Sequence, residues 1–134
     1  MNISEAARRS GLSSKTIRYY EDIGLTAPVD RTENGYRVYE DGAVEELKFL
    51  SRARDVGFDL SECRQLLGLH RDSGRQSWHA RALVLEKTEQ LQQRIDSLLA
   101  MQQVLRDMAS RCHGDEGPDC AILNDLASAD ESSL

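Results

Sequence analysis

The chain has 134 residues, enough for one small domain or for a compact head with a helical extension. No run approaches the roughly 18 apolar residues of a membrane helix, and the N-terminus lacks the apolar core of a signal peptide. The sequence therefore predicts a cytoplasmic protein with no membrane partner. Three cysteines, an odd number, argue against a framework of disulfides.

The formal net charge of −6 is unusual for a DNA-binding protein, but the charge is unevenly distributed. Residues 1–54 contain nine Lys and Arg and nine Asp and Glu, whereas residues 55–134 contain eight and fourteen. Because the excess acid lies in the C-terminal part, the N-terminal part can still present a basic face to DNA. An enzyme is not expected, since the sequence shows neither a nucleophile–base pair nor a phosphate-binding loop.

Two short helices are predicted at the start of the chain. Ser4 is expected to cap a helix over residues 5–9, and Ser13 a second helix over residues 14–22, with a glycine-containing turn between them. This order is typical of a helix-turn-helix. The second helix carries cations and phenols that suit a DNA groove, although an ordinary charged surface explains them equally well: Lys15, Arg18, Tyr19 and Tyr20.

A hairpin is predicted next. Asn34-Gly35 is the strongest short signal for a hairpin turn, and a strand over residues 36–39 follows it. A hairpin after a helix-turn-helix is a wing, which lays cations and phenols against phosphates while the helix enters the major groove. The candidate DNA contacts in the wing are Arg31, Tyr36 and Arg37.

Two further helices are predicted before the longest one. The first covers residues 41–53 and ends before Gly57, and the next is capped by Asp59 or Ser61. Cys63 falls among apolar residues at helical spacing, which predicts a core thiol rather than a metal ligand. Residues 72–75 resemble a hinge.

The longest predicted helix runs from Ser77 to Cys112 without proline or glycine. Its apolar residues recur every seven positions, with others at half-heptad spacing beside them: Val84, Leu91, Leu98 and Leu105, then Ile95, Met101, Met108 and Ala109. This pattern indicates a coiled coil, roughly 50 Å long at about 1.5 Å per residue. Because a single apolar seam needs a partner, we expect a homodimer.

The long helix ends in a loop with two thiols, Cys112 and Cys120, separated by seven residues. They match no structural zinc pattern, which needs four ligands. Two thiolates suit soft monovalent ions such as Cu(I), Ag(I) and Au(I). Cys120 also begins a predicted helix over residues 121–127, whose positive end favours a thiolate. His113 is either a third ligand or a solvated side chain.

Other interpretations of this loop stay open. Cys112 can be a core thiol that completes the heptad row, and Cys120 an incidental residue at a helix start. The two can form a disulfide, which would make the chain a redox switch. The oxygen donors Asp115, Glu116 and Asp119 can form a solvated face or attract a divalent ion. An architectural DNA-binding protein without an effector is the remaining alternative.

Two sequence blocks carry a family resemblance. Residues 17–21 (Ile-Arg-Tyr-Tyr-Glu) and 34–39 (Asn-Gly-Tyr-Arg-Val-Tyr) resemble, with their spacing, the N-terminal signature of MerR-family transcriptional regulators. Residues 53–60 resemble the turn in the second helix pair of that family. The long helix and the cysteine loop resemble the copper-responsive, CueR-type branch.

The resemblance implies a mainly α fold in three parts. These are a winged helix-turn-helix head over residues 1–75, a dimerisation helix over 76–111 in an antiparallel coiled coil, and a metal-binding loop with a short helix and tail over 112–134. Cys112 and Cys120 would be the metal ligands. Arg54 would reach a phosphate, although a solvated helix end fits it equally well.

The resemblance also assigns a role to Ser77. It stands where zinc and mercury sensors of the family carry a third cysteine, so it is expected to favour monovalent ions. The alternative is that Ser77 only caps the long helix. His113 stands where copper sensors often have proline, which leaves the choice among copper, silver and gold open.

The expected function is that of a metal-responsive transcription activator which binds double-stranded promoter DNA as a homodimer. By resemblance, the metal-free and metal-bound forms both bind a promoter with an over-long spacer. The metal-bound form would bend and undertwist the spacer so that RNA polymerase contacts both promoter elements. The implied targets are genes of metal efflux or tolerance.

Overall fold

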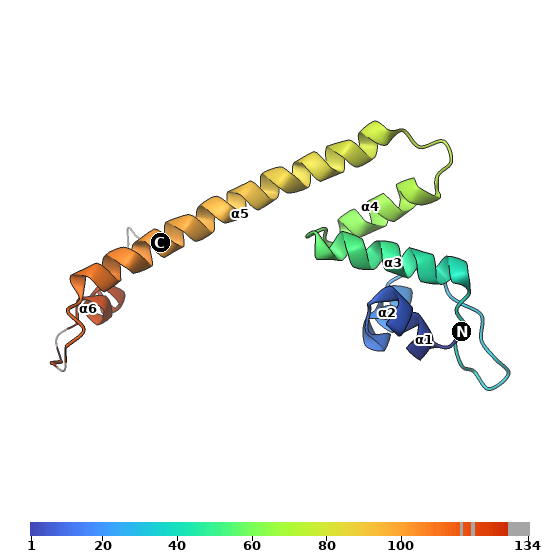
Figure 1. Ribbon diagram of the computed structural model, residues 1–134, viewed down its shortest axis with the longest axis horizontal. Coiled ribbons are helices and arrows are strands. Elements are labelled where there is room, and N and C mark those ends of the chain that lie inside the picture. The colour runs from blue at the N-terminus through green and yellow to red at the C-terminus, as the bar shows by residue number, and fades with distance from the viewer. Residues whose placement is uncertain (116, 119, 129–134) are drawn as a thin grey trace. The chain divides into compact units, whose positions relative to one another are not determined.

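The computed structural model describes residues 1–115, 117–118 and 120–128. In this part of the chain lie six helices (Figure 1): α1 (Ile3–Ser10), α2 (Ser14–Asp22), α3 (Asp41–Asp55), α4 (Leu60–Arg71), α5 (Ser77–Arg111) and α6 (Ala121–Ala127). The predicted mainly α fold is confirmed. Packing divides the chain into residues 1–87 and 88–134, inside α5. The functional boundaries expected at residues 75 and 111 stay predictions, because packing says nothing about the role of each part.

Helices α1 and α2 form the expected helix-turn-helix. Asn2, rather than the predicted Ser4, caps α1, because the helix already begins at residue 3. Ser13 caps α2 as predicted, and its hydroxyl accepts a backbone N–H of the first turn at 3.0 Å. Gly11 ends α1 with φ +82°, a left-handed conformation that favours glycine. A Cβ atom there would lie 3.4 Å from Ser51 Oγ on α3, so the turn also sits close to α3.

Helix α3 is the centre of the first unit and packs against α1 and α4. Its buried side chains recur every third residue, which keeps them on one face of the helix. They divide between two apolar clusters. One contains Ala6, Ile17, Tyr39, Val44 and Leu47, and the other contains Tyr20, Leu25, Leu50, Ala53, Phe58, Cys63 and Leu67.

Helix α4 begins with a capping box. The Asp59 side chain accepts the N–H of Glu62 at 2.8 Å, and Glu62 Oε1 accepts the N–H of Asp59 at 2.9 Å. The next residue, Cys63, is a free thiol with no exposed surface, in agreement with its predicted core role. Burial raises the pKa of the Cys63 thiol, which keeps it protonated near neutral pH.

The predicted hairpin is present between α2 and α3, where Arg31 and Arg37 form an isolated antiparallel bridge. Backbone hydrogen bonds from Thr32 to Tyr36 and from Val38 to Asp30 also join its two sides. Gly35 in the turn has φ +83°, as the turn signal requires. Residues 36–39 do not form a regular strand. Among the described residues, no further strand lies beside the hairpin, so nothing extends its backbone pairing.

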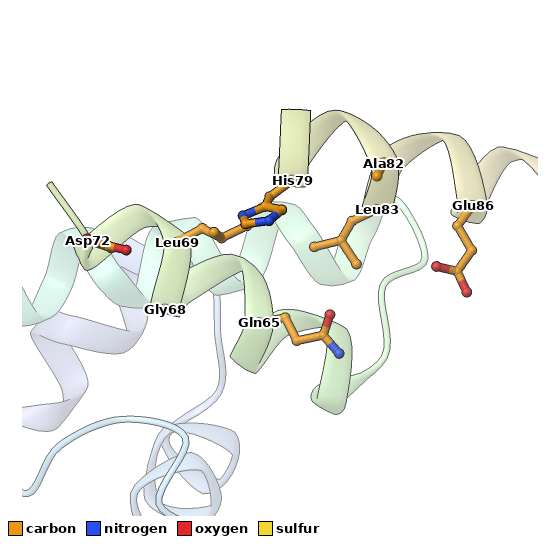
Figure 2. A pocket seen from close by; sticks show the side chains of 8 residues that line it. All are labelled: Gln65, Gly68, Leu69, Asp72, His79, Ala82, Leu83 and Glu86. Carbon is orange, nitrogen blue, oxygen red and sulfur yellow. The ribbon is translucent and has the colours of Figure 1, made fainter. Parts of the chain in front are cut away.

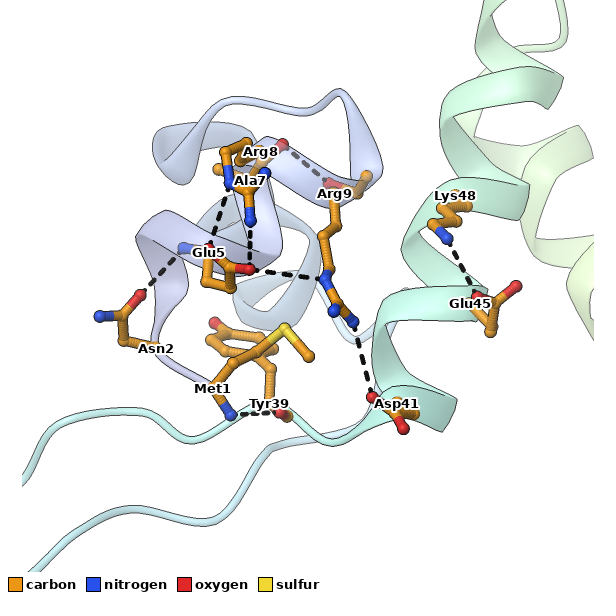
Figure 3. A network of polar contacts seen from close by, with 11 residues as sticks. Met1, Asn2, Glu5, Ala7, Arg8, Arg9, Tyr39, Asp41, Glu45 and Lys48 are labelled. Atoms are coloured by element: carbon orange, nitrogen blue, oxygen red, sulfur yellow. Dashed lines mark hydrogen bonds and ion pairs between the residues drawn. The ribbon is translucent and has the colours of Figure 1, made fainter.

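The N-terminus is tied to the end of the hairpin (Figure 3). The Met1 amino group donates to the Tyr39 carbonyl, and the Tyr39 N–H donates to the Met1 carbonyl, each at 2.7 Å. Arg9 of α1 lies 3.5 Å from a Glu5 oxygen and 3.7 Å from an oxygen of Asp41, the first residue of α3. Exposed ion pairs such as these stabilise little, so the backbone pair is the firmer connection.

Helix α5 carries the expected apolar row on an exposed surface. The exposed fractions are 47% for Val84, 49% for Ile95, 57% for Leu98 and 63% for Leu105. Large exposed apolar surfaces of this kind mark interaction sites. Among the described residues, no helix has the length and apolar character needed to cross a bilayer.

Candidate functional site

Helix α2 exposes one polar face. Lys15 and Arg18 are exposed, and half of the Tyr19 surface is accessible. The opposite face is anchored by Ile17, which has 1% of its surface exposed. Two cations and a phenol therefore stand on the outer side of the second helix of the helix-turn-helix, where a recognition helix meets the major groove.

Tyr20, which the sequence predicted as a DNA contact, is buried. Only 4% of its surface is exposed, and it belongs to the core cluster with Leu50 and Phe58. Burial raises the pKa of its phenol. Tyr20 follows Ile17 by three residues, so both fall on the inner face of α2. In this structure Tyr20 anchors the helix, and we leave it out of the proposed DNA surface.

The three hairpin residues differ in solvent exposure and in their internal contacts. Tyr36 is 72% exposed. Arg31 donates from Nη1 to the Gly35 carbonyl at 2.9 Å, across the turn. Arg37 Nε lies 3.2 Å from Glu21 Oε2, and only 20% and 11% of these two side chains are exposed. The Arg37–Glu21 ion pair thus fastens the wing to α2, a connection that the sequence did not reveal.

Arg54, expected at a phosphate, is an exposed residue that contacts both the Tyr20 phenol and the turn after α3. Its Nη1 donates to the Phe58 carbonyl at 2.9 Å, across the turn between α3 and α4. This bond orients the guanidinium. A guanidinium has five N–H donors, so the contact leaves others for a phosphate.

The two loop thiols lie together at the end of α5. Cys112 Sγ and Cys120 Sγ are 3.4 Å apart, and both residues are half-buried free cysteines. Cys112 directly follows the last residue of α5, and Cys120 directly precedes α6. An ion pair joins the two helices, with Arg111 Nη2 2.5 Å from Asp125 Oδ2. The loop therefore returns upon itself and brings the sulfur atoms together.

The start of α6 affects the second thiol. The N–H of Leu123, together with the Cys112 thiol and the N–H of Ile122, lowers the pKa of Cys120. These N–H groups belong to the first turn of α6, although none forms a capping bond of ordinary geometry with the sulfur. Unpaired N–H groups at a helix start favour a thiolate, the form that binds metals and attacks disulfides.

The donors around the thiols are few. Among the described residues, no group of three or more His, Cys, Asp and Glu side chains could hold a metal ion. His113 and Asp115 are exposed, and Glu116 and Asp119 lie outside the described residues. Two adjacent sulfur donors fit a soft ion of low coordination number, and they lack the four ligands of a structural zinc site.

Ser77 is the first residue inside α5 and is exposed. The capping position therefore falls on Gln76, whose carbonyl accepts the N–H of His79 at 3.2 Å. The expected role of Ser77 in metal selectivity and the alternative that it only caps the helix both stay predictions.

A helix-turn-helix, a hairpin wing, a second helix pair and a long helix with an exposed apolar row together define a winged helix-turn-helix protein. Residues 1–69 match the family described as MerR HTH family regulatory protein, and residues 44–108 match the family described as MerR, DNA binding. The chain belongs to the MerR family of helix-turn-helix regulators.

Individual relatives agree over almost the whole length. The chain is 47% identical to the HTH-type transcriptional regulator CueR of Yersinia pestis, over 99% of this chain and 96% of that one. It is 46% identical to heavy metal-dependent transcription regulator 2 of Rhizobium meliloti, over 95% and 86%. The crystal structure of PbrR691 from Ralstonia metallidurans in complex with lead(II) superposes with a TM-score of 0.82 at 30% identity, over 94% and 98%.

Proposed function

We propose that this protein is a metal-responsive transcription activator that senses Cu(I), and also Ag(I) or Au(I), through Cys112 and Cys120. The observation that carries the proposal is the pair of sulfur atoms 3.4 Å apart at the end of α5. Thiolates select soft ions, and a site with two of them suits ions that accept two ligands. The names of the relatives, CueR and a heavy metal-dependent regulator, support a metal as the effector.

The protein is proposed to act as a homodimer through α5. The exposed row that includes Ile95, Leu98 and Leu105 has the heptad spacing of a coiled-coil seam. In an antiparallel pair, Cys112 of one protomer approaches the partner's Ser77. The thiol pair would then lie at the subunit interface, where a local change can move the heads.

The proposed output is distortion of promoter DNA. Lys15, Arg18 and Tyr19 on α2 would enter the major groove, while Tyr36 and the wing arginines would contact phosphates. Both forms would bind a promoter of a metal efflux or tolerance gene with an over-long spacer. The metal-bound dimer would bend and undertwist it, so that RNA polymerase engages both promoter elements.

A titration of the reduced dimer tests the metal assignment. Native mass spectrometry should show Cu(I) and Ag(I) bound through two deprotonated thiols, and the same ions should raise transcription from the operator promoter in vitro. Zn(II) serves as the divalent control and should not induce. Induction by Zn(II) alone would favour the alternative of a divalent-metal sensor. The structural relative PbrR691 was solved with a divalent ion, lead(II).

The thiol distance also favours a second candidate, a redox switch. Two free thiols at 3.4 Å, one with a lowered pKa, need little movement to form a disulfide. Transcription that follows an oxidant and persists under a Cu(I) chelator would support this candidate. Transcription that needs Cu(I) under reducing conditions would contradict it.

Replacement of Arg18 tests the DNA surface. If Arg18 reads a base, Arg18→Ala should weaken operator binding by roughly 1–3 kcal/mol, about 5- to 150-fold in Kd, and relax specificity at one position. A fluorescence anisotropy titration on matched and single-base-changed operators measures both effects. Arg81→Ala removes the same charge from an exposed position on α5 and is the control. Equal losses in the two variants would mean a general charge effect instead.

A further inference from the structure

Three consecutive residues in the first turns of α4 face three different parts of the first unit. Glu62 Oε1 lies 2.8 Å from Lys87 Nζ of α5. Cys63 is fully buried in the core. Arg64 donates from Nη1 and Nη2 to the carbonyls of residues 24 and 23, at 3.0 and 3.1 Å, where α2 ends. Helix α4 thus contacts both the long helix and the helix that carries the proposed DNA contacts.

The Lys87–Glu62 pair is unusually enclosed for surface charges. Only 11% of the Lys87 side chain and 12% of the Glu62 side chain are exposed. Lys87 Nζ also lies 5.8 Å from the centroid of the Phe58 ring, within the range of a cation–π contact. The same Glu62 oxygen accepts the N–H of Asp59 in the capping box. The cost of desolvating two charges offsets much of their attraction, so we take this pair as a contact that sets the arrangement of α4 and α5 and not as a source of stability.

Beside this ion pair, a groove separates part of α4 from the start of α5. The groove has a volume of about 480 Å³, and Figure 2 shows Gln65 and Leu69 of α4 and Leu83 and Glu86 of α5 along its walls. An open groove transmits little force between two helices, because its walls lack the close contacts of a packed interface. The enclosed Lys87–Glu62 pair is therefore a firm point of connection between α4 and α5.

Glu62 and Arg64 point to opposite sides of α4. Residues two apart on an α-helix point about 200° from one another, so these side chains leave α4 on opposite sides. Cys63 lies between them and is held by the core. A rotation of α4 about this point would move the contact with α5 and the contact with the end of α2 together.

We propose that α4 is the relay between the long helix and the recognition helix, with Lys87 and Glu62 as its input and Arg64 as its output. This inference rests on the proposed function, because it assigns the route by which a change on α5 reaches α2. A displacement of Lys87 pulls on Glu62, α4 turns about Cys63, and Arg64 shifts the carbonyl end of α2. All three are positioning residues and touch neither metal nor DNA bases.

Variants that remove charge but keep shape test the relay. Lys87→Met keeps the length of the side chain, and Glu62→Gln keeps the oxygen that accepts the capping N–H. Each should lower Cu(I)-induced transcription by about tenfold or more, a coupling free energy in the usual range, with operator and Cu(I) affinities unchanged. Arg64→Met should do the same. The Lys87→Met/Glu62→Gln double variant should be no worse than either single variant, because both act through one contact.

The control is an ion pair of the same helix outside the relay. Arg71 of α4 lies 2.6 Å from Glu46 of α3, and Arg71→Met should leave induction intact. Thermal unfolding shows whether each variant is folded. Full induction in both Lys87→Met and Glu62→Gln, or an equal loss in Arg71→Met, would overturn the relay.

A second measurement separates the relay from the proposed function. A wild-type protein that ignores Cu(I) would contradict the function and not the relay. The relay is then measured with operator DNA alone, by amide hydrogen exchange in the full-length protein. Binding to DNA should slow exchange in residues 77–87 of the wild type, and Lys87→Met should remove this effect. An unchanged exchange rate in the wild type would overturn the relay.

Discussion

Cys112→Ser and Cys120→Ser should each reduce Cu(I)-induced transcription to the metal-free level while operator binding stays intact. Each substitution exchanges one of two adjacent sulfur donors for a hydroxyl, which stays protonated near neutral pH and is a poor ligand for a soft ion. One thiolate alone cannot supply two ligands. Both cysteines lie in the second unit, after residue 87, whereas the proposed DNA contacts lie in the first. Run-off transcription with and without Cu(I), beside an operator titration, measures the two effects separately.

Cys63→Ala is the matched control for these variants. It removes the third thiol of the chain, which is buried in the head among apolar side chains. A loss of stability of about 1 kcal/mol is expected from the lost packing, with induction unchanged. Induction that survives the loss of Cys112 or Cys120 would remove the two-thiolate site. Induction that fails only in Cys63→Ala would mean that the metal site lies at Cys63 in the core.

The parts of the fold that local sequence determines were predictable. Neighbouring residues alone determine three of these features: the cap at Ser13, the bounds of α2 and α6, and the turn at Gly35. The start of α1 was not predicted correctly, because Asn2 and Ser4 are equally good capping residues. The backbone pair between Met1 and a residue 38 positions away orders the chain up to Asn2, and local sequence does not contain that contact.

The loop chemistry and the family resemblance together predicted that Cys112 and Cys120 act as a pair, and their sulfur atoms lie 3.4 Å apart. Their role as metal ligands stays a prediction. The contacts that hold the other candidate residues in place were not predicted. Tyr20 looked like a DNA contact because phenols suit that role, but its spacing from Ile17 placed it in the core. The ion pairs of Arg37 and Lys87 join residues far apart in sequence, so their partners depend on tertiary packing. Glu62 follows the cap Asp59 by three residues, the spacing of a capping box, but that local pattern does not indicate its ion pair with Lys87.

Ser77→Cys should allow a divalent ion such as Zn(II) or Hg(II) to induce transcription. Two thiolates with Cu(I) carry a net charge of −1, whereas Zn(II) with the same ligands is neutral but needs three or four donors. In an antiparallel dimer the partner's Ser77 lies near Cys112, and a thiolate there supplies the third strong ligand. The N-terminal end of α5 would help to stabilise the added negative charge.

Ser77→Ala separates selectivity from helix capping. Since Ser77 is the first residue inside α5, its replacement by alanine should change stability by no more than about 0.5 kcal/mol and should admit no divalent ion. Dose–response curves for Cu(I) and Zn(II) in each variant, with urea unfolding alongside, make the comparison. If Ser77→Cys still responds to monovalent ions alone, the selectivity role of Ser77 fails and only the capping role remains. If Ser77→Ala loses about 1 kcal/mol instead, the serine hydroxyl also acts as a cap, a role that is compatible with ion selectivity.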